Sequence, residues 1–273
     1  MKPSKKRKFI SSRELYTILI TCTLIFMISL YRPLYFVKRD IGSAIANRYQ
    51  LSNFDILCSF EGNGLLDAFA YVFVIIPIFS ALIIYLIDTN NSLIRSIRYG
   101  DRNKIWNKNV SLILISTLLL SVFLVIGGYL ISGLFLKGYN NTWNTKLGYP
   151  YMIYGTTKIW PKLSMLLATY KVIPIFWITT FLGLSFIGIL IYTLKLFIRN
   201  VYVYGAVMVI AFNDLYSILG FKVILGISIS SKNWLYPRSI IIANIYFLVG
   251  IVVLYSIGRF MNSRKEQGIE KRH

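Results

Sequence analysis

The chain has 273 residues, of which 56% are hydrophobic and 15% charged, and its mean hydropathy is +0.62. This composition excludes an ordinary soluble catalytic domain, because most of the apolar residues lie in long uninterrupted stretches. The formal net charge of +20 is large enough to suggest nucleic-acid binding, so its meaning depends on where the basic residues lie between those stretches.

The first segment of the chain, residues 1–14, is basic. It contains Lys5-Lys6-Arg7-Lys8 and ends in Ser11-Ser12-Arg13-Glu14, where a serine followed three positions later by an acid signals a helix start. The apolar stretch that follows imitates a signal peptide, but Tyr31-Arg32-Pro33-Leu34 is too bulky for a cleavage site. We expect an uncleaved anchor helix, preceded by either a short interfacial helix or a basic tail.

Six stretches are apolar over roughly the ~20 residues that are needed to cross a hydrocarbon core of ~30 Å. They are approximately Tyr16–Leu30, Leu65–Ile87, Val110–Leu136, Val172–Leu194, Val201–Leu219 and Ser239–Ile257. The second is the clearest, since its only charge, Asp67, lies at its very start. The sequence predicts an all-α polytopic membrane protein with six transmembrane helices in a single domain, residues 1–273.

The basic residues are unevenly divided between the two sides of this arrangement. Four segments on one side (1–14, 88–109, 195–200 and 258–273) carry 18 of the 30 Lys and Arg residues in about 58 positions. The other side carries 12 in about 88 positions. Basic residues concentrate on the cytoplasmic side of membrane proteins, so both termini are expected to be cytoplasmic. The charge then contacts anionic lipid, and no nucleic-acid partner is predicted.

The region from Val201 to Ile229 is too long for one straight span. As a single helix its 29 residues would reach about 43 Å, and Gly220 and Lys222 interrupt it. A span that ends near Leu219, followed by a re-entrant piece over Val223–Ile229, fits the pattern better. Non-helical backbone at that depth requires surrounding protein or water, so the piece is expected beside a pathway.

Groups able to perform chemistry are scarce. The only histidine is His273, the last residue, which removes histidine-based nucleophilic sites and histidine-rich metal sites. The phosphate-binding pattern GxxxxGK[ST] does not occur in the sequence. We therefore expect no enzymatic activity, no catalytic residue, no metal and no cofactor in this chain.

Asp214 is the one charge well inside a predicted span, and Asn213 precedes it. A carboxylate at that depth is costly unless it is paired, hydrated or protonated. It should face a polar interior, with Asn213, Tyr216 and Ser217 as partners. Two roles remain open: a pathway residue that relays protons or contacts substrate, and a hydrogen-bonded anchor between helices.

The segment between the second and third spans is predicted to form a short amphipathic helix over residues 94–106. Arg95, Arg98 and Arg102 recur at spacings of three and four, which places them on one helical face. Trp106 is expected to be exposed at the end of that helix. Such a helix suits docking onto a partner protein, and ordinary positive-inside charge is the other interpretation.

The Arg98-Tyr99-Gly100-x-Arg102 stretch, after a long second span, resembles the first cytoplasmic loop of small permease subunits of ABC-2-type exporters. The Gram-positive bacteriocin and antimicrobial-peptide exporters are the most similar. The resemblance implies that residues 94–106 are a coupling helix that binds a separate ATPase subunit through Arg95, Arg98, Tyr99, Gly100, Arg102 and Trp106. It also implies that two permease chains, identical or different, pair through spans one and five.

The chain is thus expected to be a permease subunit in the bacterial cytoplasmic membrane, exporting an amphipathic peptide, drug or lipid-like substrate. A proton-coupled secondary transporter that uses Asp214 is one alternative, although such transporters usually contain internal repeats. A non-transporting immunity or accessory membrane protein is another.

Overall fold

A computed structural model describes residues 11–46, 49–58, 63–90, 102–218, 222–229 and 231–270. This part of the chain is all-α, as predicted. Five of its helical segments are long and apolar enough to cross a membrane: Ser12–Gly42, Ala68–Asn90, Asn103–Phe135, Thr169–Leu194 and Arg238–Ser263. Each corresponds to one of the predicted spans. The remaining predicted span corresponds to the shorter helix α11 (Asn200–Tyr216), which has 17 residues.

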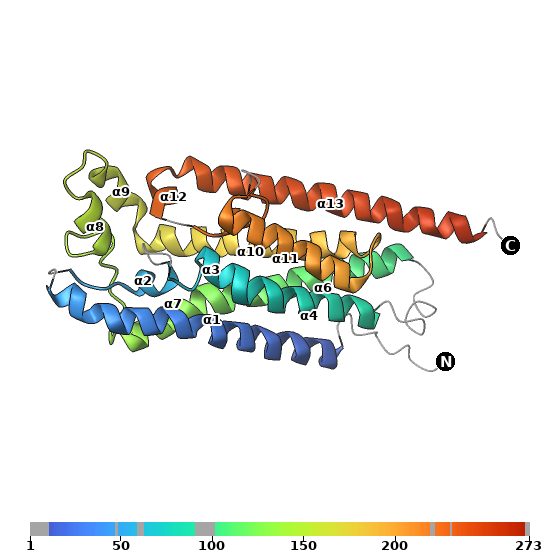
Figure 1. Cartoon of the computed structure of the whole chain (residues 1–273), viewed down its shortest axis with the longest axis horizontal. Helices are drawn as coiled ribbons and strands as arrows, with labels where there is room; N and C mark the ends of the chain where they lie inside the picture. Colours follow the sequence, from blue (N-terminus) through green and yellow to red (C-terminus); the bar gives the residue numbers. More distant parts are fainter. Residues whose placement is uncertain are drawn as a thin grey trace, which may run out of the picture.

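The long helices lie side by side along the long axis of the molecule (Figure 1). Helix α1 (Ser12–Ala46) begins, and α13 (Arg238–Glu270) ends, at one end of the bundle, which we call the proximal end. The short helices α8 (Tyr149–Tyr154) and α9 (Trp160–Leu166) lie at the opposite, distal end.

Two of the spans are composite. Helix α3 (Ala68–Ala70), the π-helical turn η1 (Tyr71–Ile75) and α4 (Ile76–Asn90) run on from one another. Helix α6 (Arg102–Val122), the π-helical turn η2 (Phe123–Gly127) and α7 (Gly128–Phe135) form the other. A π-helical turn inserts one extra residue into a helix and shifts the facing of the side chains after it.

Helix α10 (Thr169–Leu194) lies in the middle of the bundle and packs against α4, α6 and α13. Gly188 allows α6 to approach, because a Cβ there would lie 2.5 Å from Ile113 Cγ2. Buried hydroxyl pairs also join α10 to its neighbours: Thr117 and Ser185 are 2.9 Å apart, and Tyr71 and Thr180 are 3.1 Å apart. Close backbones and hydroxyl hydrogen bonds are the usual means by which helices associate in lipid.

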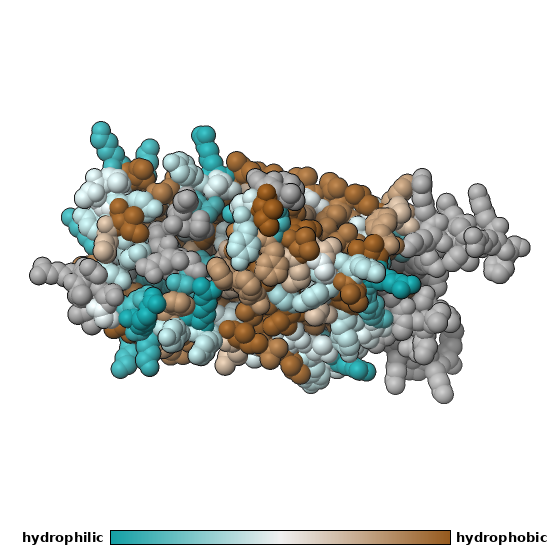
Figure 2. Space-filling view, in the orientation of Figure 1, coloured by the Kyte–Doolittle hydropathy of each residue, from teal (hydrophilic) through white to brown (hydrophobic). Residues whose placement is uncertain are grey.

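The outer helices keep apolar side chains on the surface. In the most apolar window of α13 only 11% of the residues are buried, against 61% for α10. Figure 2 shows hydrophobic residues over the middle of the visible face and hydrophilic residues toward the distal end. Apolar residues over the middle of this face and polar residues toward the distal end fit the profile of a bilayer.

Helix α1 is longer than the sequence predicted. It continues past the expected end at Leu30, through Pro33, to Ala46. Proline removes one backbone donor from a helix. The preceding residue, Arg32, contacts the segment that leads into α3 and so holds this part of α1 in place. Its guanidinium donates to Asn63 Oδ1 at 2.9 Å and lies 4.5 Å from the centre of the Phe69 ring.

The distal end has a core of its own around α2 (Asn53–Leu57). All five residues of this short helix are buried. The ring of Phe54 contacts those of Tyr129 and Trp143, at centroid distances of 5.6 and 5.4 Å. The segment after α1 therefore folds back into the end of the bundle.

Candidate functional site

The Asp214 carboxylate is fully buried and binds backbone amides of a later segment. Its Oδ2 accepts hydrogen bonds from the N–H groups of Ile224, at 2.5 Å, and Leu225, at 2.9 Å. Its Oδ1 accepts one from Asn213 Nδ2 at 3.3 Å. Helix α11 ends just beyond, at Ser217, whose φ of 54° is left-handed and turns the chain back.

These bonds hold the 3₁₀ turn η3 (Leu225–Ile227) inside the bundle. Leu225 and Ile227 are buried, and Ile227 occupies the space left by Gly183 of α10, where a Cβ would lie 2.6 Å away. Buried amides without partners are costly, and the carboxylate supplies an acceptor for the amides of Ile224 and Leu225.

Of the residues that were predicted to contact Asp214, one does so and another is exposed. Asn213 contacts it as expected, whereas Tyr216 is 65% exposed. None of the ion pairs among the described residues includes Asp214. Because the Asp214 carboxylate already accepts hydrogen bonds from two backbone amides, its geometry favours the role of a structural anchor over that of a proton relay.

The predicted docking helix falls largely outside the described residues. Residues 91–101, which include Arg95, Arg98, Tyr99 and Gly100, are not among them, and Arg102 is the first residue of α6. The expected exposure of Trp106 is wrong. Its side chain is 0% exposed, because α6 begins before it and carries it into the bundle.

Trp106 joins three helices at the proximal end. Its ring stacks on that of Tyr192 in α10, with centroids 4.2 Å apart and planes at 18°. Across from it, Gly258 of α13 has no side chain, and any Cβ there would overlap the indole. The spacing of the arginines predicted an exposed amphipathic helix, and nothing in the local sequence indicated that the indole packs between helices.

A buried ion pair lies near Trp106. Lys108 Nζ is 3.5 Å from Glu14 Oε1, and the two side chains are 8% and 3% exposed. Lys108 also donates to Asn90 Oδ1 at 3.0 Å. Glu14 caps its own helix by accepting from the Ser11 N–H at 2.8 Å. The beginnings of α1 and α6 and the end of α4 are thereby connected.

A second ionic group connects the proximal ends of α4, α10 and α11. Lys195, just after α10, lies 2.5 Å from Asp88 Oδ1 in α4, and Asn200 of α11 donates to Asp88 Oδ2 at 2.6 Å. Sequence reasoning missed these pairs. The available signal was the position of Glu14 and Asp88, two of only ten acidic residues, directly at the ends of predicted spans.

At the distal end, Asp55 is a buried carboxylate with two donors. It accepts from the Ser52 N–H and from Trp143 Nε1, both at 2.7 Å. Burial raises its pKa from 3.8 to about 6, and the two hydrogen bonds only partly oppose that shift.

Cys58 follows α2 and is also buried. Its thiol donates to the carbonyl of Ile229 at 2.7 Å, which ties α2 to the segment after η3. Burial, with the nearby carboxylates of Asp67 and Asp55, raises the pKa of this thiol. Asp67, at the start of the second predicted span, is 4% exposed and accepts from the Gly64 N–H. Neither cysteine is in a disulfide.

Two of the pockets among the described residues lie beside α1. The larger of these two, about 560 Å³, lies at the distal end between α1, α2 and the segment after α7, and is lined in part by Asn53 and Lys137. The smaller, about 240 Å³, lies between α1 and η1 and is lined by Arg32, Phe69 and Phe73 among others.

Five membrane-length helices, an outer apolar belt and buried charges restricted mainly to the helix ends define a multi-pass membrane protein. Comparison with protein-family models, with curated proteins and with solved structures finds no match.

Proposed function

We propose that this protein is the permease subunit of an ABC-2-type exporter in the bacterial cytoplasmic membrane. In this proposal α11 completes a set of six spans, both termini are cytoplasmic, and η3 lies in a re-entrant segment. A separate ATPase binds residues 94–106, two permease chains pair, and an amphipathic peptide, drug or lipid-like molecule is exported.

The observation that carries the proposal is a hydrogen bond between α4 and α6, the two helices that flank residues 91–101. Asn90 is the last residue of α4, Lys108 lies in the second turn of α6, and the two are hydrogen bonded. A partner that pushed on residues 91–101 would therefore move α4 and α6 together. Glu14 would pass that displacement to α1.

A second observation concerns the route to the remaining helices. Asp88, two residues before Asn90, contacts both Lys195 and Asn200, so α10 and α11 are connected to the same end of α4. Helix α11 in turn holds η3 through Asp214. These polar contacts support a mechanism in which a movement of α4 at the proximal end is transmitted through α11 to the buried turn η3.

The test is co-purification from the native host. Affinity-tagged wild-type chain is expected to bring down an ATPase, and Arg95→Glu with Arg98→Glu should abolish that association and the transport phenotype. The matched control reverses two exposed charges at the distal end, Lys158→Glu with Lys162→Glu, and should leave the association intact. Recovery of no ATPase, together with transport that survives deletion of neighbouring ATPase genes, would refute the proposal.

A further inference from the structure

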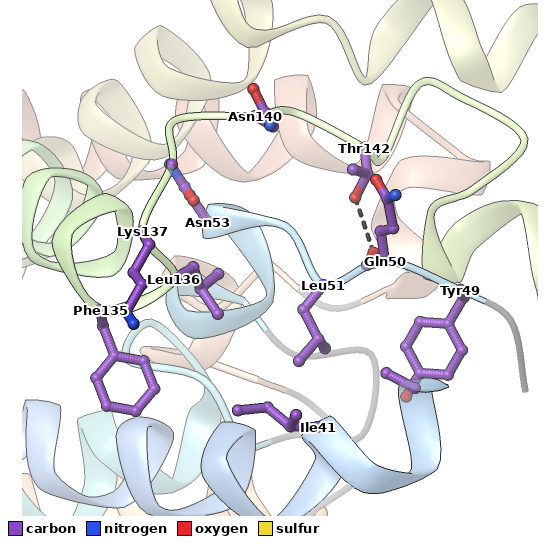
Figure 3. Close-up of a pocket in the computed structure, with 12 residues that line it drawn as sticks. Ile41, Tyr49, Gln50, Leu51, Asn53, Phe135, Leu136, Lys137, Asn140 and Thr142 are labelled. Carbon is purple, nitrogen blue, oxygen red and sulfur yellow. Dashed lines mark hydrogen bonds between the residues drawn. The ribbon is translucent and has the colours of Figure 1, made fainter. Parts of the chain in front are cut away.

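The larger of these two pockets lies near the distal ends of two long helices. It is lined by Ile41 and Ala44, in the last two turns of α1, and by Phe135, the last residue of α7. Figure 3 shows Ile41, Leu51 and Leu136 around the lower part of the hollow, with Asn53 and Lys137 on one side of it. The pocket therefore combines apolar walls with polar groups at the distal end of the bundle.

One of those polar groups is a buried donor without a partner. Asn53 is 2% exposed, and its Nδ2 donates to no described residue. Buried amide groups are nearly always hydrogen bonded, so an orphan that lines a pocket indicates an acceptor brought by a ligand.

The other group is a cation held in an unfavourable backbone conformation. Lys137 follows α7 with φ at 55°, a region that glycine adopts without strain and lysine does not. The Gly138 N–H bonds the Gly133 carbonyl at 2.9 Å, and the Lys137 N–H bonds that of Leu134 at 3.4 Å. This is the helix ending that usually places glycine where Lys137 stands.

The charge of Lys137 is also not neutralised by the protein. Its side chain is exposed, and no ion pair among the described residues includes it. Backbone strain kept at a ligand-facing position is a recognised mark of function. An unpaired ammonium, an orphan amide donor and apolar walls together suit an anion that carries a hydrocarbon chain.

We propose that this pocket binds an anionic phospholipid of the leaflet at the distal end. The lipid phosphate accepts hydrogen bonds from Lys137 Nζ and Asn53 Nδ2, and the first part of an acyl chain lies against Ile41, Leu51 and Phe135. A lipid is preferred to a peptide carboxylate because α1 and α7 both reach their distal ends beside the pocket, as expected for a site near the lipid headgroups.

The test measures lipid retention by the purified full chain, using native mass spectrometry from micelles doped with phosphatidylglycerol or phosphatidylcholine. Wild type should retain phosphatidylglycerol preferentially. Lys137→Gly should weaken that retention about ten-fold, as expected for one charge-assisted hydrogen bond. This variant relieves the backbone strain, so its thermal stability should stay the same or rise, and misfolding cannot explain the loss.

Two further variants complete the design. Asn53→Leu should also reduce retention, because it removes the orphan donor without breaking a bond that the protein makes to it. Lys146→Gly, at an exposed lysine of the same end that does not line the pocket, is the matched control and should retain lipid like wild type. Equal retention of both lipids by wild type, or an undiminished preference in Lys137→Gly, would overturn the proposal. Lys137-dependent capture of an apolar peptide with a free carboxylate, without any lipid preference, would overturn it in favour of a peptide.

Discussion

The indole of Trp106 lies flat on the phenol ring of Tyr192, with 4.2 Å between ring centroids, and is completely enclosed. Tyr192 in turn accepts a hydrogen bond from Asn109 at 2.9 Å, so α6 and α10 are joined by both stacking and polar contacts. Gly258 closes the site from α13. Three helices therefore meet at one aromatic pair.

Replacing Gly258 by alanine should loosen this contact. The new Cβ would overlap the rigid indole, so α13 or Trp106 must shift, and overpacking of this kind costs about 1–3 kcal/mol. We expect a clear fall in the apparent melting temperature in detergent. Gly205→Ala, in a helix where the new methyl group meets nothing within 4 Å, should be neutral or slightly stabilising. Equal melting temperatures for the two variants would contradict the packing described.

Asp214 should tolerate replacement by asparagine far better than by leucine. Asparagine keeps an oxygen acceptor for the amides of Ile224 and Leu225, whereas leucine leaves both buried N–H groups unpaired, at about 1–3 kcal/mol each. The expected result is a small loss of stability for Asp214→Asn and a large one for Asp214→Leu. Hydrogen exchange at the Ile224 and Leu225 amides should accelerate only in the leucine variant. If Asp214→Asn stays folded but abolishes transport, a proton-coupled role regains support.

The stability of the distal end should depend on pH through Asp55. Its pKa is raised in the folded state, so the folded protein binds the proton more tightly than the unfolded chain. The stabilisation is complete below about pH 4 and is lost as pH rises through about 6, a change of about 3 kcal/mol in the free energy of unfolding. Unfolding measured from pH 4 to 7.5 should show this downward slope.

The control for that experiment separates Asp55 from other titrating groups. Asp55→Asn cannot titrate, so the wild-type slope should be absent from this variant. Asp40→Asn changes a partly exposed carboxylate that pairs with its neighbour Arg39, and it should keep the slope. A slope shared by all three proteins would assign the pH dependence elsewhere.

The pair Glu14–Lys108 should show strong coupling in a double-mutant cycle. Lys108→Met removes the cation beside the buried Glu14 carboxylate, and Glu14→Gln removes the anion beside the buried Lys108 ammonium, so each should cost about 3–5 kcal/mol. The double variant removes both charges and should recover much of that loss. Melting temperatures of the four proteins measure the coupling, and simple additivity would show that the two residues do not interact.

The long helices could be predicted because a continuous apolar run is sufficient to specify a span. The predicted stretch Val172–Leu194 lies within α10, Thr169–Leu194, and Leu65–Ile87 nearly matches the segment Ala68–Asn90. Asp214 could also be singled out, since a lone acid within such a run must find partners. Its partners, the amides of Ile224 and Leu225, have no sequence signature because backbone N–H groups are present everywhere.

What could not be predicted depends on contacts between distant residues. The burial of α2 relies on Trp143, which is 88 positions from Asp55 and donates to it. The burial of Trp106 relies on Gly258 in the last helix. The sequence around Trp106 is basic, and α2 contains a carboxylate, Asp55, so in both cases burial becomes evident only from the tertiary partner.

The brevity of α11 has a consequence for the surrounding bilayer. Seventeen residues rise about 26 Å, which is less than the ~30 Å of an average hydrocarbon core. In the six-span arrangement proposed above, lipids beside α11 would shorten or tilt their chains to avoid exposing them to water, and the membrane would thin locally along this helix. A thinned strip lowers the barrier for moving a polar headgroup or an amphipathic molecule from one leaflet to the other.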